Sequence, residues 1–175
     1  MKNIWFIILC FPLVISCINK NKILVTESDD LITSTYYFIR HAEKDRSDSL
    51  NDNPHLIEIG KQRAEHWNEI FKNIKFDAVY STNFNRTKET ATPTAIKNKL
   101  ELTIYDPKTM DIPSFLNNTR GKTILVVGHS NTIPNFVNKI LENDTYNQID
   151  DDNNGNLYIV TINGNDISSS LLSID

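Results

Sequence analysis

From Thr35 onward, short apolar runs alternate with longer stretches of helical periodicity, and this alternation limits the fold more than any other feature of the chain. The apolar runs predict buried strands at 36–39, 78–80, 102–105 and 123–127. The intervening stretches predict helices at 57–71, 83–100, 109–118 and 131–141. Strands that alternate with helices indicate an α/β domain, a three-layer α/β/α sandwich with a mostly parallel sheet.

The ends of these elements carry local signals. Thr82 or Asn83 is expected to cap the helix over 83–100, and Pro93 is expected to kink that helix or start a fresh turn. Near the C-terminus, strand patterns at 157–162 and 167–172 flank the sequence Asn-Gly-Asn-Asp. Asn-Gly indicates a β-hairpin, because both central residues of the turn need positive φ. We therefore expect an antiparallel hairpin at the edge of the sheet.

The N-terminus has the pattern of a targeting segment. Lys2 precedes an uncharged apolar run over 4–15, which is too short to span a bilayer and is typical of a secretory signal. Val-Ile-Ser-Cys at 14–17 resembles a bacterial lipobox, which implies cleavage before Cys17 and lipid on that residue. This divides the chain into a signal peptide (1–16), a tether (17–34) and a folded domain (35–175), anchored by lipid in the cell envelope, outside the cytoplasm.

Other interpretations of the N-terminus remain open. The apolar run would also suit an uncleaved anchor, or an ordinary signal that is cleaved elsewhere. The apolar residues 23–25 in the tether would also suit docking onto the domain surface.

Composition excludes several classes of function. Both cysteines, Cys10 and Cys17, lie in the first segment, so the domain cannot have a disulfide framework. Four histidines and two cysteines rule out a cysteine-based zinc cluster. The net charge is −4 and no basic stripe is present, so nothing favours nucleic acid as a partner.

Polar clusters follow three of the predicted strands. Arg40 and His41 follow the first, residues 81–86 follow the second, and residues 128–130 follow the strand at 123–127. Each cluster alone has an ordinary structural interpretation. In open α/β sheets, however, ligands bind beyond the carboxyl ends of the strands. Their convergence therefore predicts one binding site at that edge.

The residue types in these clusters suit phosphoryl transfer, which needs an in-line nucleophile, cations on the phosphoryl oxygens and an acid for the leaving oxygen. Arg40 and Arg86 offer bidentate contacts to phosphate. His41 can attack as a neutral imidazole if a carbonyl holds its other nitrogen as N–H. His129 would add a donor, and beside phosphate its pKa should rise. The amides near Ser130 open a helix and offer a further anion site. His55 and His66 we interpret as ordinary loop and helix-surface residues.

Four segments, in collinear order, resemble the histidine phosphatase (phosphoglycerate mutase-like) superfamily. Phe-Ile-Arg-His-Ala-Glu-Lys at 38–44 is similar to its Arg-His-Gly/Ala-Glu opening, and Gly60 to Ala64 lies in a segment like its Leu-Thr-x-x-Gly-x-x-Gln/Arg-Ala. Residues 80–91 resemble Tyr-Ser-Ser-x-x-x-Arg-x-x-Gln-Thr-Ala, and 126–130 match the strand of the second catalytic histidine. The resemblance implies that His41 is the phosphorylated nucleophile, that Arg40, Arg86 and His129 bind phosphate, and that no metal or cofactor is needed.

The chain also departs from the family pattern. Many members place a glutamate general acid 20 to 30 residues after the second arginine, where this chain offers Asp106 and Asp111. We favour Asp106 because it directly follows a strand, with Asp111, Glu43, water or the substrate itself as alternatives. Ala42 replaces the commoner glycine. Residues 45–48 lack the asparagine of mutase members, and the short span from Arg86 to His129 leaves little room for a cap over the site.

These observations predict a membrane-anchored, metal-independent phosphomonoester hydrolase that works through a phosphohistidine on His41. Its open site would suit broad specificity or a bulky substrate, such as a phosphoprotein or a sugar phosphate on a larger molecule. The alternative is a non-catalytic lipoprotein that binds a phosphorylated or anionic ligand. The nucleophilic imidazole weighs against this alternative, because a binding protein has no need of one.

Overall fold

A computed structural model of the chain describes residues 32–174 and contains one six-stranded sheet, in the order β3-β2-β4-β1-β5-β6. The strands are β1 (Thr33–Arg40), β2 (Ala78–Thr82), β3 (Leu102–Tyr105), β4 (Thr123–Gly128), β5 (Asn156–Asn163) and β6 (Asp166–Ser173). The first four are parallel, whereas β5 runs antiparallel to β1 and pairs with β6 in an antiparallel hairpin. The mostly parallel sheet with an antiparallel edge pair is confirmed.

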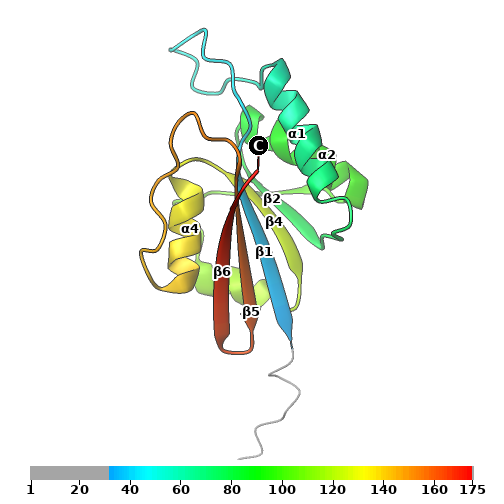
Figure 1. Ribbon diagram of the computed structural model, residues 1–175, viewed down its shortest axis with the longest axis vertical. Helices are drawn as coiled ribbons and strands as arrows, with labels where there is room; N and C mark the ends of the chain where they lie inside the picture. The colour runs from blue at the N-terminus through cyan, green and yellow to red at the C-terminus, as the bar shows by residue number, and fades with distance from the viewer. Residues whose placement is uncertain (1–31, 175) are drawn as a thin grey trace, which may run out of the picture.

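Helices cover both faces of this sheet (Figure 1). They are α1 (Glu58–Ile70), α2 (Asn85–Asn98), α3 (Ile112–Asn118) and α4 (Thr132–Leu141). Buried residues of α1 and α2, among them Trp67 and Ala91, belong to one apolar cluster, and those of α3 and α4, among them Phe115 and Phe136, belong to another. The expected three-layer α/β/α arrangement is therefore confirmed.

The central strand β4 shows how the sequence builds these two cores. Ile124 and Val126 belong to the cluster of α3 and α4, while Leu125 and Val127 belong to the cluster of α1 and α2. All four are buried. Because side chains alternate across a strand, a run of apolar residues is needed wherever both faces are covered. This packing holds the carboxyl end of β4 firmly at the edge where the site lies.

Some element ends differ from the sequence expectations. Strand β1 begins at Thr33, so Thr33 and the buried Ser34 belong to the sheet rather than to the tether. The residue that precedes α2 is Phe84, without a side-chain cap, so the expectation of Thr82 or Asn83 was wrong. Pro93 lies inside α2, which continues past it as one helix. Helix α3 starts at Ile112, because the carboxylate of Asp111 accepts the backbone N–H of Ser114 and caps it.

The hairpin also closes differently from the Asn-Gly expectation. Asn163 pairs with Asp166, so the two-residue turn is Gly164-Asn165. Of these residues only Gly164 has positive φ, at 59°. The glycine at the first central position therefore supplies the left-handed conformation, and Asn163 remains the last residue of β5.

The predicted signal peptide, Cys17 and almost all of the tether lie outside the described residues. Within residues 32–174, no helix is long and apolar enough to cross a membrane.

Candidate active site

The carboxyl ends of β1, β2, β3 and β4 meet at one edge of the sheet and bring the predicted residues together. Arg40 pairs in register with Gly128, and Thr82 with Tyr105. The backbone N–H of His41 donates to the carbonyl of Gly128 at 2.9 Å, which continues the pairing one residue beyond β1. His41 and His129 therefore leave neighbouring strands side by side, with ring centroids 5.4 Å apart.

Contacts around His41 fix both its backbone and its ring. Its Nδ1 lies 2.8 Å from the carbonyl oxygen of Ala42. A carbonyl can only accept, so Nδ1 carries the hydrogen and Nε2 presents a lone pair. The side chain of Asn154 donates to the carbonyl of His41 at 2.7 Å, and the N–H of Ala42 donates to Thr90 at 2.9 Å. His41 is thus held in the tautomer that a nucleophilic imidazole needs.

The pKa of His41 is lowered to about 3, chiefly by burial and also by the charges of Arg40, His129 and Arg86, while the hydrogen bond to Ala42 opposes this shift. The ring is 4% exposed. Because its pKa lies far below neutrality, His41 is uncharged at pH 7 and keeps the lone pair on Nε2 available.

His129 is oriented by a chain of hydroxyl groups. Its Nε2 lies 2.9 Å from Oγ1 of Thr82, which donates to Oγ1 of Thr87, and Thr87 in turn donates to the carbonyl of Thr82. With both hydroxyl hydrogens used in this way, Thr82 accepts from His129, so Nε2 of His129 carries a hydrogen. The ring of Phe84 lies edge-on to His129, with centroids 5.1 Å apart.

Burial and the charges of Arg86, Arg40 and Lys44 lower the pKa of His129 to about 4. This direction is opposite to the rise that we expected beside a phosphate. The two statements concern different surroundings: the protein groups alone favour the neutral ring, whereas a bound dianion would favour the protonated ring.

Arg86 lies in the first turn of α2, next to both histidines. Its guanidinium sits 4.4 Å from the centroid of the Phe84 ring, and Nη1 donates to the carbonyl of Asp52 at 3.3 Å. Burial and the nearby charge of Arg40 lower the pKa of Arg86. Its Nε is buried and has no partner within residues 32–174. A buried donor without a partner is costly, so this atom is well suited to an anion.

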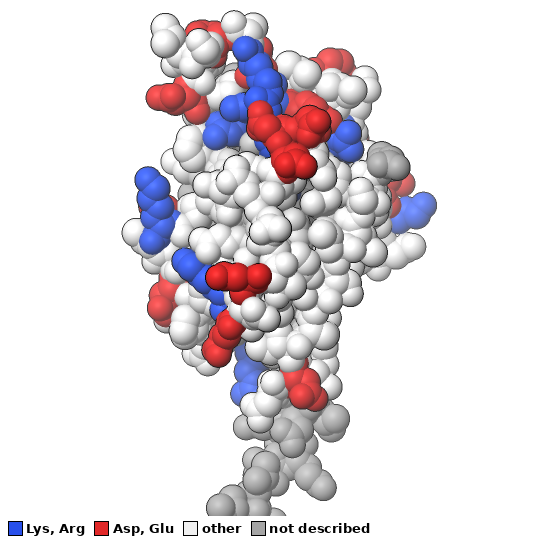
Figure 2. Space-filling model, turned by 60° about the vertical axis from the view of Figure 1, so that its left-hand side comes forward, with Lys and Arg blue, Asp and Glu red and all other residues white. Residues whose placement is uncertain are grey.

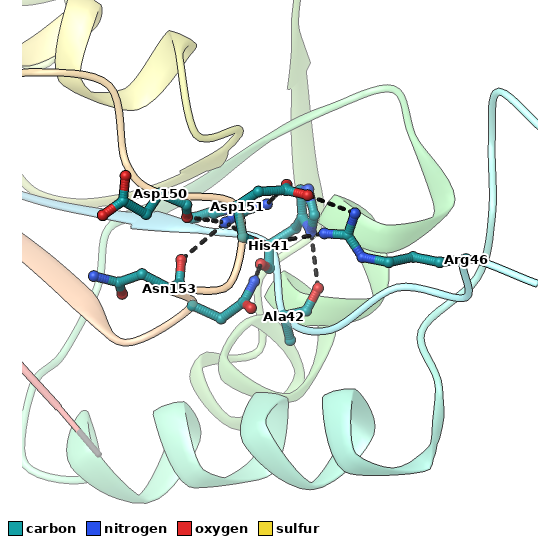
Figure 3. Close-up of polar contacts among 8 residues, drawn as sticks. His41, Ala42, Arg46, Asp150, Asp151 and Asn153 are labelled. Carbon is teal, nitrogen blue, oxygen red and sulfur yellow. Dashed lines mark hydrogen bonds and ion pairs between the residues drawn. The ribbon is translucent and has the colours of Figure 1, made fainter. Parts of the chain in front are cut away.

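Arg40 is 2% exposed and is held by the loop before β5, whose residues Asp150, Asp151 and Asn153 are drawn in Figure 3. Its Nη1 donates to the carbonyls of Asp150, Asp151 and Asn153 at 2.8–3.0 Å, and Nη2 pairs with the carboxylate of Asp151 at 2.8 Å. Arg46 pairs with the other oxygen of the same carboxylate at 2.6 Å. Of the described residues none bonds the buried Nε of Arg40. Arg40 can therefore donate to a phosphate through its Nε and through the second N–H of Nη2, but not through Nη1.

Three further residues of the site were not identified from the sequence. Asp151 and Asn154 come from the loop between α4 and β5, about 110 residues from their partners. Lys44 is half-buried, and its ammonium has no hydrogen-bond or ion-pair partner in the described part of the chain. Burial and the charges of Arg86 and Arg46 lower its pKa. Only Lys44 carried a sequence signal, since it directly follows the Arg-His-Ala-Glu motif.

The site opens into two neighbouring cavities. Arg86, His129 and Asp106 line one of about 760 Å³, and His41, Glu43 and Lys44 line one of about 280 Å³. The two imidazoles thus lie side by side with one cavity reaching each of them, whereas Arg40 is buried and lines neither cavity. The structure gathers the predicted residues at one edge, while their roles as nucleophile and phosphate ligands stay a prediction.

The cavities separate the three candidate acids. Asp106 shares a cavity with His129 and Arg86. Asp111 caps α3 and lines a cavity of about 330 Å³, which Asp106 also lines but which neither histidine reaches. Glu43 accepts a hydrogen bond from Nε of Arg63 at 2.7 Å, which gives it a structural partner. Position therefore favours Asp106 over the other two.

The surface around the site is mixed in charge rather than uniformly basic. Basic and acidic side chains gather together at the upper end of the view in Figure 2, above a broad uncharged area. The exposed ion pair of Arg46 with Asp151 belongs to the site loops. Within residues 32–174, no group of three or more His, Cys, Asp or Glu side chains could hold a metal ion. The cationic charge next to the histidines comes from Arg40, Lys44 and Arg86.

Comparison with known proteins agrees with this arrangement. The family model of the histidine phosphatase superfamily (branch 1) matches residues 36–107, which include β1 to β3 and the residues Arg40, His41 and Arg86. No curated protein matches the chain significantly in sequence.

Several solved structures share the fold. The protein histidine phosphatase SixA, complexed with tungstate, aligns over 79% of this chain and 96% of its own with a TM-score of 0.62 and 13% identity. A mycobacterial glucosyl-3-phosphoglycerate phosphatase aligns over 81% and 98% with a TM-score of 0.64 and 11% identity. Phosphoserine phosphatase from Entamoeba histolytica, in complex with 3-phosphoglyceric acid, aligns over 81% and 96% with a TM-score of 0.58 and 20% identity.

At these identities the structural matches show the fold alone. The match of the family model adds the sequence segments that carry Arg40, His41 and Arg86. The chain is thus similar in sequence to the histidine phosphatase superfamily over residues 36–107, and it shares its fold with several solved phosphatases.

Proposed function

We propose that the chain is a phosphomonoester hydrolase that transfers the phosphoryl group to Nε2 of His41. The observation that carries this proposal is the hydrogen bond from Nδ1 of His41 to the Ala42 carbonyl, together with a pKa of about 3. It leaves a neutral ring with a lone pair on Nε2. The phosphatases among the structural neighbours support the same chemistry.

In the first step, Nε2 of His41 attacks phosphorus and the P–O bond to the leaving group breaks. The departing oxygen takes a proton from Asp106, which shares the larger cavity with His129 and Arg86. The unpartnered Nε atoms of Arg40 and Arg86 donate to the phosphoryl oxygens, where negative charge has to be stabilised. His129 donates through its second nitrogen once the bound anion has raised its pKa.

In the second step, Asp106 takes a proton from water, and the resulting nucleophile attacks phosphorus. The P–N bond breaks, inorganic phosphate leaves, and His41 returns to its neutral form. The proton that Asp106 takes from water restores the acid for the next cycle.

Hydrolysis of 4-nitrophenyl phosphate in the presence of EDTA tests the proposal. We expect turnover by the wild type and a loss of at least 1000-fold in His41→Ala, since the covalent route is then removed. His66→Ala is the matched control, because His66 is exposed on α1 and should leave turnover unchanged. Equal rates in wild type and His41→Ala would exclude His41 as the nucleophile and leave the ligand-binding alternative.

Trapping the intermediate gives an independent test. Brief incubation with a 32P-labelled phosphate monoester and denaturation in alkali should leave label on the wild type that acid removes. Label that survives acid, or label that persists in His41→Ala, would contradict a phosphohistidine at this residue.

We also propose that the domain is tethered outside the cytoplasm through lipid on Cys17, on the strength of the lipobox-like sequence at 14–17. Expression with a labelled fatty acid should label the wild type and Cys10→Ser but not Cys17→Ser. Cys10 is the matched control, because it lies in the segment that cleavage would remove. Equal labelling of both variants would refute the assignment.

A further inference from the structure

The larger cavity extends well beyond the space that a phosphoryl group needs. Its volume is about 760 Å³, within the range of pockets that hold whole small-molecule ligands. Arg86, His129 and Asp106 line it, and so do the apolar side chains of Phe84, Ile104 and Pro107. The question is which portion of a substrate this cavity receives.

The geometry of in-line transfer answers this question. The leaving oxygen departs from the side of phosphorus opposite to the nucleophile. Of these two cavities, His41 lines the smaller and the candidate acid Asp106 lines the larger. A phosphoryl group held beside His41 and His129 therefore directs its leaving group toward Asp106, into the larger cavity.

Part of the wall of that cavity is apolar. Phe84 is half-buried and fixed between Arg86 and His129. Ile104 lies on the edge strand β3, next to Tyr105, and is 48% exposed. Pro107 follows directly after Asp106. An exposed isoleucine at this place gains nothing from the core but would gain from covering by a ligand.

Charge in the same cavity argues against a second acidic group on the substrate. Besides Arg86, its charged side chains are Asp106 and Lys108, which have opposite signs. Asp106 also accepts the backbone N–H of Lys108 at 2.9 Å, which keeps the carboxylate at the start of this segment. With Arg86 engaged by the phosphoryl group, the charges of Asp106 and Lys108 cancel, so the cavity offers no net positive charge to a second acidic group.

We propose that the cavity walled by Phe84, Ile104 and Pro107 binds the leaving group, and that the enzyme prefers phosphate monoesters with a ring-sized apolar leaving group. Aryl phosphates of low molecular weight are the substrate class that this surface fits. The proposal rests on the proposed hydrolase activity and adds its specificity.

The test compares phenyl, 2-naphthyl and 3-carboxyphenyl phosphate, all of which release phenols. We expect kcat/KM of the wild type to be about tenfold higher for 2-naphthyl than for phenyl phosphate, since the second ring buries additional apolar area. We expect 3-carboxyphenyl phosphate to be the poorest of the three. In Ile104→Ala the naphthyl preference should fall to about threefold, because part of the wall is gone.

Ile96→Ala is the matched control, since Ile96 is also an exposed isoleucine, on α2, and it should keep the tenfold preference. If Ile104→Ala fails to fold, Ile104→Val removes one methylene and should lower the preference by a smaller factor. Inhibition by vanadate should be the same in all variants, which separates the leaving-group wall from the phosphoryl site.

The outcomes separate the two proposals. Hydrolysis with equal kcat/KM for phenyl and naphthyl esters, or a preference for the carboxyphenyl ester, would overturn the leaving-group site and leave the hydrolase standing. A naphthyl preference that Ile104→Ala does not reduce would also overturn it. Absence of hydrolysis of all three esters by the wild type would refute the hydrolase and this inference together.

Discussion

Two neutral histidines, one buried and one half-buried, should make the stability of this protein depend on pH in a way that mutation can dissect. In the folded protein the pKa of His41 is about 3 and that of His129 about 4. The ordinary pKa of an unfolded histidine is about 6.5. As pH falls below 6.5, the unfolded chain takes up protons that these two rings in the folded protein do not, so the unfolded state is favoured.

The size of this effect follows from the same values. Between pH 8 and pH 5, the folded protein loses about 2 kcal/mol of unfolding free energy through His41 and about 2 kcal/mol through His129. Urea unfolding at the two pH values measures the difference. His41→Gln replaces the ring with a neutral side chain, so the loss from pH 8 to pH 5 should be about 2 kcal/mol smaller than in the wild type.

His66→Gln is the matched control, because His66 is exposed and should change the pH dependence little. The comparison is between variants, so carboxylates that titrate near pH 5 contribute equally to each and cancel. If His41→Gln loses as much stability on acidification as the wild type, His41 is not a buried neutral ring, and the argument for a ready nucleophile fails with it.

Three kinetic predictions follow from the site. Asp106→Asn should lower kcat/KM by at least 100-fold for phenyl phosphate but by less than about fivefold for 4-nitrophenyl phosphate, because kcat/KM reports the first step, in which only the poorer leaving group needs the proton. Equal losses of kcat/KM would exclude Asp106 as the acid. Thr82→Val removes the acceptor for Nε2 of His129 and should reduce kcat/KM about tenfold, and an unchanged value would show that Thr82 does not orient the ring. Asp151→Asn loses the ion pair with Arg40 and should raise KM about tenfold. Asp152→Asn is the control and should leave KM unchanged, since Asp152 lines the same cavity without bonding Arg40. Equal KM values in the two variants would contradict a role of Asp151 in positioning Arg40.

The layers of the fold could be predicted from the sequence because, in most elements, the spacing of the apolar residues matches the faces that are buried. The run at 123–127 is apolar on both faces of β4, and the structure covers both faces. Local signals were less reliable. Thr82 was a plausible helix cap by residue type, but its hydroxyl donates to Thr87 and contacts His129 instead, and α2 starts after Phe84.

The candidate site was predictable to the extent that its residues sit in local motifs. Arg40, His41, Arg86 and His129 each end or follow a recognisable strand, and the parallel arrangement brings such ends together. The partners of Arg40 were not predictable, because the loop at 150–154 carries no pattern that points to a residue so distant in the chain. The lowered pKa values of the histidines also depend on burial, which motif spacing does not reveal.

The bonds of Arg40 have a consequence for how the protein matures. Three backbone carbonyls at positions 150, 151 and 153 accept from one nitrogen of its guanidinium, and Asn154 secures the carbonyl of His41. A nascent chain that ends before this loop already contains both arginines and both histidines, yet nothing fastens Arg40. Activity should therefore emerge only when synthesis has passed residue 154, and a truncation just before this loop should abolish activity while sparing every motif.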